Sequence, residues 1–536
     1  MALLLGFFTA ICLIMETKLA VPIAAKDLET ARQQVKAAIS AGAELLELRT
    51  DYLKDLSVEI VQNLIDYAKS AGDKQLPIIV TCRDQRQGGM MDYEQKLRVD
   101  VLVRALKAGA EYIDFEYDNF LIAENRKIIK QALSENPQAR LILSAHNFET
   151  KFPDIKKLHR DILGIYPEVI PKLIYAANHI NDCFEAFDLL DQNSGDRIVF
   201  CMGEAGLISR IIAKKLNSFV TFASINDQNA TAPGQLTIEQ FKQLYRYDCI
   251  NTETELFGVI ADPVGHSLSP AIHNACFGEK QMNKLYLPFL VGGRQQEFDL
   301  FLHNVIERKW LNFVGFSVTI PHKQSALEFA RANGGFVEPL AEKIGAVNTL
   351  IINTDGKLSA YNTDYSAALD AVTSTLGIAR EGLRGLPVAV VGAGGVARAI
   401  VAGLSDAGTT ICIYNRTVSK AEKLAAEFNC DFAPLDDLKD MNAKLVVNCT
   451  SIGMHPNVNA TPVRQKCLKS DMAVFDTVYN PAETLLLKQA MQAGAKTIDG
   501  ITMFVNQGMA QFKLFTNAEG NAELMRKTIG NKFKNV

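Results

Sequence analysis

Two neighbouring stretches decide how this chain is organised, Asn229-Ala-Thr-Ala-Pro-Gly-Gln235 and Phe257-Gly-Val-Ile-Ala-Asp-Pro-Val-Gly-His-Ser-Leu-Ser-Pro270. The first is typical of a loop that closes a unit built by the residues before it. The second is typical of the first strand and loop of another unit. Between them, Tyr245 to Thr254 is short, polar and poor in structural signals, so we expect it to link two separate domains.

The composition is that of a globular chain, with 48% apolar and 22% charged residues among 536. A net charge of -4 and the lack of a basic run argue against nucleic-acid binding. The ten cysteines are scattered, without metal-binding spacing. We therefore expect no structural disulfide, no metal site and a reducing compartment, the cytoplasm.

The first fifteen residues, Met1 to Met15, are almost wholly apolar. They lack the basic start and the cleavage site of a signal peptide, and they are too short to span a bilayer. We favour an over-extended start with Met15 as the natural first residue, and we expect no stable membrane association.

Strand-like and helical stretches alternate from Lys18 to Tyr247. The strand-like runs are Lys18–Ala24, Leu45–Arg49, Pro77–Cys82, Tyr112–Glu116, Arg140–His146, Val169–Ile174, Arg197–Met202 and Phe219–Ala223, and a helix is expected over Thr237–Tyr247. Eight such units predict a (β/α)8 barrel over residues 16–247, with its chemistry at the C-terminal ends of the strands.

Residues with functional side chains stand at or just beyond most of those ends: Glu47, Arg49, Arg83, Glu116, His146, Lys172, Met202 and Arg210. Lys172 lies in an apolar strand, where burial would lower its pKa and free its amine to attack a ketone. The alternative is a surface lysine whose stem covers apolar residues. His146 is placed to move protons and Glu116 to orient it, while the arginines suit a carboxylated substrate.

This half resembles type I 3-dehydroquinate dehydratase. The resemblance rests on six motifs in order: Leu46-Glu-Leu-Arg-Thr-Asp51, Ile113-Asp-Phe-Glu116, Ser144-Ala-His146, Ile170-Pro-Lys172, Gly206-Leu-Ile-Ser-Arg210 and Ala232-Pro-Gly-Gln235. It implies that Lys172 forms an imine with the substrate, that His146 moves protons and that Arg210 holds a carboxylate. Gln235 joins the substrate contacts, with Thr231 where the family often has serine.

Phe257 to Asp364 is typical of a small α/β domain, predicted here as residues 254–375 completed by 501–536. Ser267 and Ser269 could donate hydroxyls to an anion, although capping a helix before Pro270 is the simpler interpretation of their spacing. Lys323 and Asp364 each follow a strand-like run, so a pair at one cleft is plausible.

A strand, a Gly-rich turn and a helix follow at Leu386–Ala399, within a predicted nucleotide-binding domain at 376–500. Such a turn holds a pyrophosphate at the helix N-terminus, through Gly392, Ala393, Gly394, Gly395 and Val396. The next strand ends in Asn415, Arg416 and Thr417 rather than in an acid. An arginine there suits a 2′-phosphate, helped by Lys420, and favours NADP over NAD.

The second half resembles shikimate dehydrogenase, with a two-lobed architecture that includes a Rossmann domain. The resemblance implies that Lys323 and Asp364 are the catalytic pair and that Gly500 contacts the cofactor. The substrate contacts that it implies are Ser267, Ser269, Thr319, Asn348, Tyr479 and Gln507. Ser317 departs from the asparagine usual in single-domain members and matches the fused type.

Together the halves predict a cytoplasmic bifunctional enzyme that converts 3-dehydroquinate to 3-dehydroshikimate and reduces this to shikimate with NADPH. Two alternatives stay open: a Schiff-base aldolase fused to another NADP-dependent reductase, and a non-catalytic binding protein.

Overall fold

A computed structural model describes residues 16–192, 195–229, 231–232 and 234–534, with the side chains of residues 533 and 534 excepted. The prediction for Met1 to Met15 therefore lies outside the described residues, as do Ala230 and Pro233 of the loop quoted above. The chain divides into two compact units, one that ends at Thr254 and one that begins at Glu255.

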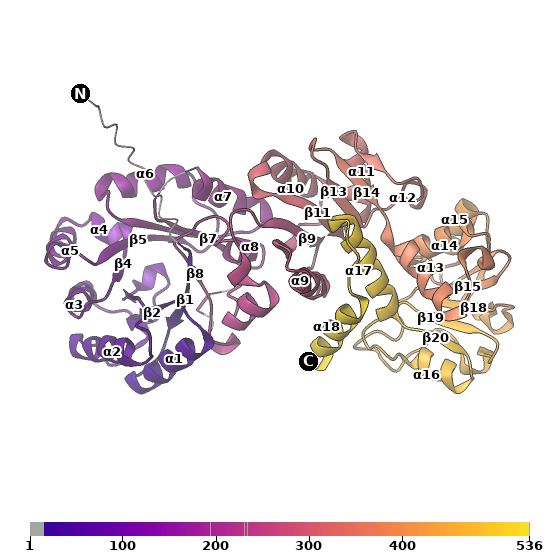
Figure 1. The fold of residues 1–536 in the computed structure, drawn as a ribbon, viewed down its shortest axis with the longest axis horizontal. Coiled ribbons are helices and arrows are strands. Elements are labelled where there is room, and N and C mark those ends of the chain that lie inside the picture. Colours follow the sequence, from indigo (N-terminus) through magenta and orange to yellow (C-terminus); the bar gives the residue numbers. More distant parts are fainter. Residues whose placement is uncertain (1–15, 193–194, 230, 233, 535–536) are drawn as a thin grey trace, which may run out of the picture. The chain divides into compact units, whose positions relative to one another are not determined.

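The first unit is an eight-stranded parallel barrel surrounded by helices (Figure 1). Its strands are β1 (Lys18–Ile23), β2 (Leu45–Arg49), β3 (Ile78–Thr81), β4 (Tyr112–Glu116), β5 (Arg140–Asn147), β6 (Ile170–Ala176), β7 (Ile198–Met202) and β8 (Val220–Phe222). They pair in sequence order, with β1 against both β2 and β8. A backbone bond from Phe219 to Arg197 joins the start of β8 to that of β7. The predicted barrel is confirmed.

The helices of this unit are α1 (Leu28–Ala41), α2 (Val58–Ser70), α3 (Gln95–Lys107), α4 (Tyr117–Leu121), α5 (Ala123–Glu135), α6 (Ile155–Ile165), α7 (Cys183–Asp191) and α8 (Leu207–Ile211). Asp27, Ser57 and Asp154 cap α1, α2 and α6 with their side-chain oxygens. The capped helices cover strands that are almost wholly buried. This packing holds the C-terminal end of each strand in a defined position.

The segment after the barrel differs from its prediction in two ways. The helix expected over Thr237–Tyr247 is shorter and wider than expected: residues 238–244 are helical, and Gln240–Leu244 form a π-helical segment closed by a backbone bond from Tyr245 to the carbonyl of Gln240. The expected linker is also structured, because Tyr247 is fully buried and its hydroxyl donates to Thr17 O at 3.0 Å. Two buried tyrosines thus tie a sequence that looked polar to the barrel.

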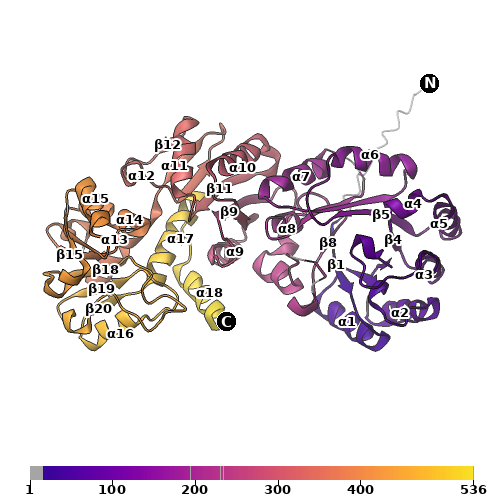
Figure 2. The same cartoon turned by 180° about the vertical axis from the view of Figure 1, so that it is seen from behind.

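The second unit contains two six-stranded sheets (Figures 1 and 2). The first has the order β10-β9-β11-β13-β14-β12 and is mixed, with β13 antiparallel to both neighbours. Its elements are β9 (Glu255–Ala261), α9 (Ser269–Glu279), β10 (Lys284–Leu290), α10 (Gln295–Glu307), β11 (Phe313–Val318), α11 (Lys323–Ala332), β12 (Phe336–Val337), α12 (Pro339–Ile344), β13 (Thr349–Ile352) and β14 (Leu358–Tyr361).

The second sheet is wholly parallel, in the order β17-β16-β15-β18-β19-β20 expected of a Rossmann domain. It follows α13 (Thr363–Leu376) and contains β15 (Pro387–Val391), α14 (Gly395–Asp406), β16 (Thr410–Asn415), α15 (Val418–Phe428), β17 (Asp431–Pro434), β18 (Leu445–Asn448), β19 (Ala473–Asp476), α16 (Leu485–Gln492) and β20 (Lys496–Ile498).

Two C-terminal helices, α17 (Gly500–Thr516) and α18 (Ala522–Lys534), return to the first sheet (Figure 2). Phe512 and Phe515 of α17 pack in one core with Phe257 of β9. Gln511 of α17 accepts from Ser317 Oγ on β11 at 2.7 Å. The expected return of the Phe504–Phe515 helix to the first lobe is confirmed.

Candidate active sites

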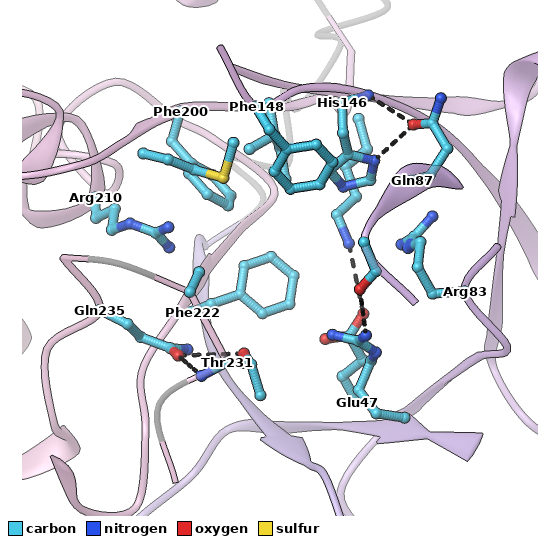
Figure 3. Close-up of a pocket in the computed structure, with 16 residues that line it drawn as sticks. Glu47, Arg83, Gln87, His146, Phe148, Phe200, Arg210, Phe222, Thr231 and Gln235 are labelled. Carbon is cyan, nitrogen blue, oxygen red and sulfur yellow. Dashed lines mark hydrogen bonds and ion pairs between the residues drawn. The ribbon is translucent and has the colours of Figure 1, made fainter. Parts of the chain in front are cut away.

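A pocket of about 90 Å³ opens at the C-terminal ends of the barrel strands (Figure 3). Its lining contains many of the side chains singled out from the sequence, namely Glu47, Arg49, Arg83, His146, Lys172, Met202, Arg210, Thr231 and Gln235. They come from four strands, β2, β5, β6 and β7, and from the segments that follow β3, β7 and β8. The barrel therefore gathers these residues around one cavity, as its topology predicts.

Lys172 on β6 is buried at the base of this pocket. Its Nζ donates to Asp114 Oδ2 at 2.7 Å and to Glu47 Oε1 at 3.4 Å, and it lies 4.8 Å from the centre of the Phe222 ring. The surface-lysine alternative is wrong, since the residue is 4% exposed. The sequence revealed the burial of Lys172 but not its contacts with these two carboxylates.

His146 is held by a residue that the sequence did not identify. The Gln87 side-chain oxygen accepts from the His146 backbone N–H at 3.0 Å and lies 3.2 Å from its ring Nδ1. A backbone N–H can only donate, so the contacting amide atom is the oxygen, and Nδ1 must carry the hydrogen. Nε2 is then left with a free lone pair.

The pKa of His146 is lowered well below its usual value, first by burial and then by the positive charges of Arg83 and Lys172. The ring is therefore neutral at physiological pH. It also stacks on Phe148, with ring centres 5.8 Å apart. A neutral, oriented imidazole is suited to accept a proton.

The expected contact between Glu116 and His146 is wrong. Both Glu116 oxygens are engaged by other groups, which are Arg83, Arg98, the backbone N–H of Asp84 and the side chain of Asn119. Two arginines therefore bind this carboxylate in place of His146. Glu116 instead helps to hold Arg83, whose other ion pair is with Asp114 at 2.8 Å.

Glu47 and Arg49 of β2 each contact other side chains at the wall of the pocket. Glu47 Oε1 accepts from Thr81 Oγ1 at 2.8 Å in addition to Lys172. Arg49 forms a two-pronged ion pair with Asp51, at 2.9 and 2.8 Å. Both residues are thus fixed in place at the pocket wall.

Arg210 is the exception among the buried cations of this site. It is 2% exposed, and neither Nε nor Nη2 has a hydrogen-bond partner among the described residues. Its guanidinium lies 4.3 Å from the centre of the Phe200 ring. Burial lowers the pKa of Arg210 to about 10, so the group remains charged at neutral pH. A buried unpaired cation that lines a pocket is an arrangement suited to binding an anion.

Thr231 and Gln235 lie in the loop after β8, on the side of the pocket opposite the histidine (Figure 3). Gln235 Oε1 accepts from the Thr231 backbone N–H at 2.7 Å and lies 3.2 Å from its hydroxyl. The two residues therefore support one another.

In the second unit the structure brings Lys323 and Asp364 together. Lys323 Nζ forms an ion pair with Asp364 Oδ2, and Asn348 Nδ2 donates to Asp364 Oδ1 at 2.9 Å. Lys323 begins α11 and Asp364 lies in the first turn of α13. The sequence suggested that these two residues, which are forty-one positions apart, form a pair, and the fold brings them into contact.

The other predicted substrate contacts are placed less tightly. Ser267 Oγ accepts from the backbone N–H of Ser269, the first residue of α9, at 3.3 Å. The N-cap position is occupied by Leu268 and has no side-chain cap bond, so the expected capping by serine is not formed. Thr319 and Gln507 are half-buried. Tyr479 is 41% exposed beside Phe504. The described contacts bring none of these to the Lys323–Asp364 pair, whereas Asn348 touches it directly.

The Gly-rich turn between β15 and α14 leaves room for a ligand. A side chain at Gly392, where φ is +111°, would crowd Thr450 and the Cys449 carbonyl, whereas Gly394 and Gly395 border open space. The N-cap residue of α14 is Gly394, which has no side chain to cap the first amides of the helix beside Ala393 and Val396. Such amides suit a pyrophosphate.

The residues expected at the other end of a cofactor follow β16. Asn415 Nδ2 donates to Thr417 O at 2.8 Å and shapes the turn. Arg416 is exposed in this turn, and Lys420 is exposed in the first turn of α15. Gly500 begins α17 so close to the Val478 carbonyl that a Cβ would lie 2.4 Å from its oxygen. These positions are consistent with an adenosine 2′-phosphate site.

Two polar residues at the barrel site were given no role from the sequence: Gln87, which lines the pocket, and Asp114, which contacts Lys172. Asp114 shares a strand face with Glu116, because alternate residues of a strand point the same way, and this spacing could have revealed it. Gln87 lies in a short helical turn, Gln85–Gln87, of the loop after β3, where no periodicity exists. Only the fold shows that it touches His146.

Among the described residues, no group of three or more His, Cys, Asp or Glu side chains has the arrangement of a metal site. Within the same residues, none of the helices has the length and apolar character needed to cross a membrane.

Family models match the chain in the order of its two units. The model for type I 3-dehydroquinase matches residues 19–252. Three others match the second unit: the shikimate dehydrogenase substrate binding domain at 259–350, shikimate / quinate 5-dehydrogenase at 377–480 and the shikimate 5'-dehydrogenase C-terminal domain at 500–529.

Some individual relatives match about half of the chain. The shikimate dehydrogenase (NADP(+)) of Methanosarcina mazei is 41% identical over 286 residues, which are 51% of this chain and 97% of the relative. A crystal structure of shikimate 5-dehydrogenase from Thermus thermophilus, in complex with NADP(H) and shikimate, is 32% identical with a TM-score of 0.45. It covers 51% of this chain and 98% of that one.

One relative spans both units. The bifunctional 3-dehydroquinate dehydratase/shikimate dehydrogenase, chloroplastic, of Arabidopsis thaliana is 33% identical over 520 residues, which cover 94% of this chain and 82% of the relative. With the type I dehydroquinase and shikimate dehydrogenase models matched in succession, the chain belongs to the family of bifunctional 3-dehydroquinate dehydratase/shikimate dehydrogenases.

Proposed function

We propose that the first unit dehydrates 3-dehydroquinate to 3-dehydroshikimate and that the second reduces this product to shikimate with NADPH. The observation that carries the proposal is the presence, in one pocket, of the Lys172 amine and of the Arg210 guanidinium, whose Nε and Nη2 have no hydrogen-bond partner among the described residues. An amine suits the ketone of the substrate and a free buried cation suits its carboxylate.

In the barrel, the Lys172 amine would attack the substrate ketone and form an imine, while the carbonyl oxygen leaves as water. His146 would then take a proton from the carbon next to the imine through its free Nε2. The same histidine would return that proton to the departing hydroxyl group, which leaves as water. Hydrolysis of the imine would release the product and restore the amine.

The remaining pocket residues would orient the ring. Arg210 would bind the carboxylate, with Gln235 and Thr231 closing that side, while Glu47, Arg49 and Arg83 would contact the opposite side. Glu116 would hold Arg83 in place rather than act on His146, because its oxygens are bound to Arg83 and Arg98.

In the second unit, the N-terminus of α14 and the small residues before it fit a dinucleotide. Gly392, Ala393, Gly394, Gly395 and Val396 would hold its pyrophosphate, Gly500 would lie near its other end, and Asn415, Arg416, Thr417 and Lys420 would hold the 2′-phosphate. NADPH supplies a hydride when it is bound. Lys323, held by Asp364, would give the carbonyl oxygen its proton, and Asn348 would keep Asp364 in position.

The substrate of this second reaction would be oriented by hydroxyl and amide groups. Ser267 and Ser269 would donate to its carboxylate, and Thr319, Tyr479 and Gln507 would contact the ring. We propose domain limits of 16–247, 254–375 completed by 501–536, and 376–500. The separation of the chain at Thr254 supports independent sites.

We also propose a cytoplasmic location and small molecules as the ligands of both sites. The cysteines of the described residues carry free thiols, which suits a reducing compartment. Separation of cell fractions followed by activity measurements would test the location.

The direct test is incubation of the full chain with 3-dehydroquinate and NADPH, with product separation by chromatography. We expect shikimate, and Lys172→Ala should abolish its formation from 3-dehydroquinate while reduction of added 3-dehydroshikimate continues. Cleavage of the substrate into smaller fragments would favour the aldolase alternative. Absence of any product would favour a binding protein.

A further inference from the structure

Asp114 on β4 is the nearest negative group to the Lys172 amine. Its carboxylate is fully buried and has three partners. Oδ2 accepts from Lys172 Nζ at 2.7 Å and from Arg83 Nη2 at 2.8 Å, while Oδ1 accepts from Ser144 Oγ at 2.7 Å. Groups from β5, β6 and the loop after β3 therefore fix this side chain in one position.

This carboxylate stays ionised. Burial alone would raise the pKa of Asp114, but the positive charges of Arg83 and Lys172, and the hydrogen bonds that they donate, outweigh burial and hold the pKa well below its usual range. Asp114 is therefore unsuited to accept the proton that Lys172 must lose before it attacks a ketone. It is a permanent negative charge beside the reacting nitrogen.

The protonation state of the imine decides whether dehydration proceeds. When the new C–N bond replaces the C=O bond and the oxygen leaves as water, the imine nitrogen is either neutral or protonated. Only the protonated form withdraws electrons strongly enough to release a proton from the adjacent carbon. A carboxylate within hydrogen-bond distance of that nitrogen favours the charged form in a buried site.

We propose that Asp114 is the counter-ion of the protonated imine on Lys172, an inference that rests on the proposed dehydratase function. The other charged groups that face this nitrogen do not replace it. Glu47 on β2 is farther away, at 3.4 Å, and Arg83 carries a positive charge. His146 on β5 is neutral.

The test uses the full chain, 3-dehydroquinate and two reductants. Borohydride reduces neutral and protonated imines alike, whereas cyanoborohydride at neutral pH reduces the protonated form. We expect the native protein to give a Lys172 adduct with both, as measured by mass spectrometry. In Asp114→Asn, borohydride capture should persist while cyanoborohydride capture and kcat for dehydration each fall at least about tenfold.

Asp51→Asn is the matched control. It neutralises another fully buried carboxylate of the same barrel, one that pairs with Arg49 at 2.8 Å and has no contact with Lys172. The ratio of the two captures should remain as in the native protein, even where binding through Arg49 weakens. Reduction of added 3-dehydroshikimate by each variant checks that the second unit is intact.

Three results would overturn the inference. An unchanged capture ratio in Asp114→Asn would show that this carboxylate does not set the imine's charge. A raised KM with an unchanged kcat would show that Asp114 only supports Arg83. Lack of any adduct in the native protein would remove the imine itself, and with it the dehydratase proposal.

A measurement on the native protein applies even where Asp114→Asn does not fold. With the counter-ion in place, the capture ratio should stay constant from about pH 7 to about pH 9. A decline over this range, like that of a free imine in water, would contradict the role of Asp114.

Discussion

Arg210→Met should raise the stability of the barrel and, at the same time, remove the predicted bond to the carboxylate of the substrate. In the free protein the guanidinium is buried, and two of its nitrogens have no hydrogen-bond partner among the described residues. A methionine keeps most of the apolar volume and removes the charge. The residue predicted to bind the carboxylate is therefore also expected to destabilise the unliganded fold.

The magnitude follows from the pKa of Arg210, which burial lowers from 12.5 to about 10. At about 1.4 kcal/mol per pH unit, the buried charge costs roughly 3 kcal/mol at any pH below about 10, where both folded and unfolded chains are protonated. Loss of the contact with Phe200 offsets about 1–2 kcal/mol of this. The net gain of about 1–2 kcal/mol should raise the Tm of a barrel of this size by roughly 2–8 °C.

The assay is calorimetry of the full chain, followed in parallel by the fluorescence of its single tryptophan, Trp310. Trp310 belongs to the second unit, so the transition without a fluorescence change is that of the barrel. The same samples should show KM for 3-dehydroquinate raised at least about tenfold, because a charge-assisted hydrogen bond is lost.

Arg98→Met is the control with the opposite expected sign. Arg98 is equally buried, but it has ion pairs with Asp84 at 2.9 Å and with Glu116. Its removal breaks both ion pairs and leaves Asp84 with the exposed Arg86 and Glu116 with Arg83. We expect this to destabilise the barrel by about 3–5 kcal/mol. If Arg210→Met destabilised the barrel as much as Arg98→Met, the guanidinium of Arg210 would have to be satisfied within the fold and our reasoning would be refuted.

Three further predictions concern the second unit. Arg416→Ala should raise KM for NADPH at least about tenfold and affect NADH much less, since the 2′-phosphate loses a charged partner; equal losses would make Arg416 structural. Ser269→Gly should narrow the expected preference for shikimate over quinate in kcat/KM, because space for the extra hydroxyl of quinate opens; an unchanged ratio in a folded variant would contradict this. His273 is buried with neither ring nitrogen bonded among the described residues, and burial lowers its pKa to about 3, although Gln511 acts in the other direction. As the pH falls below about 6.5, His273 takes up a proton in the unfolded chain before it does so in the folded chain. The free energy of unfolding is therefore undiminished by His273 above that pH and falls by up to about 1.4 kcal/mol per pH unit below it. His273→Phe should flatten this decline in urea unfolding followed by Trp310 fluorescence, and an equally steep decline would exclude His273 as its source.

Much of the fold and most of the candidate barrel site could be predicted because of periodicity. Lys172 is a charged residue within an apolar strand, and His146 and Arg210 lie at or beyond the ends of such strands. A barrel brings its strands around one centre whatever the loops do. The same reasoning placed the strands of the barrel within two residues of their observed limits. For the barrel strands, the order of apolar runs along the chain was sufficient to predict the fold.

Prediction failed where a contact depended on which of several neighbours came closer. Glu116 follows β4 and His146 lies on β5, so adjacent strands suggested a contact. Arg83 and Arg98, which enter from β3 and α3, occupy both oxygens of the carboxylate instead. Competition between partners is a three-dimensional property that strand order does not contain. The support of His146 by Gln87 was missed for the related reason that a loop has no repeat.

The two proposed sites use a lysine held by an aspartate, and their burial fits different tasks. The Lys172 side chain is 5% exposed and its partner Asp114 is wholly buried, whereas Lys323 is 25% exposed and Asp364 is 13% exposed. A lysine that forms a covalent imine gains from exclusion of water, because water hydrolyses that bond and weakens the pull of the counter-ion. A lysine that delivers a proton in each turnover must be recharged, and contact with solvent allows this. The difference in exposure is therefore consistent with the covalent chemistry proposed for the barrel and with the proton delivery proposed for the second unit.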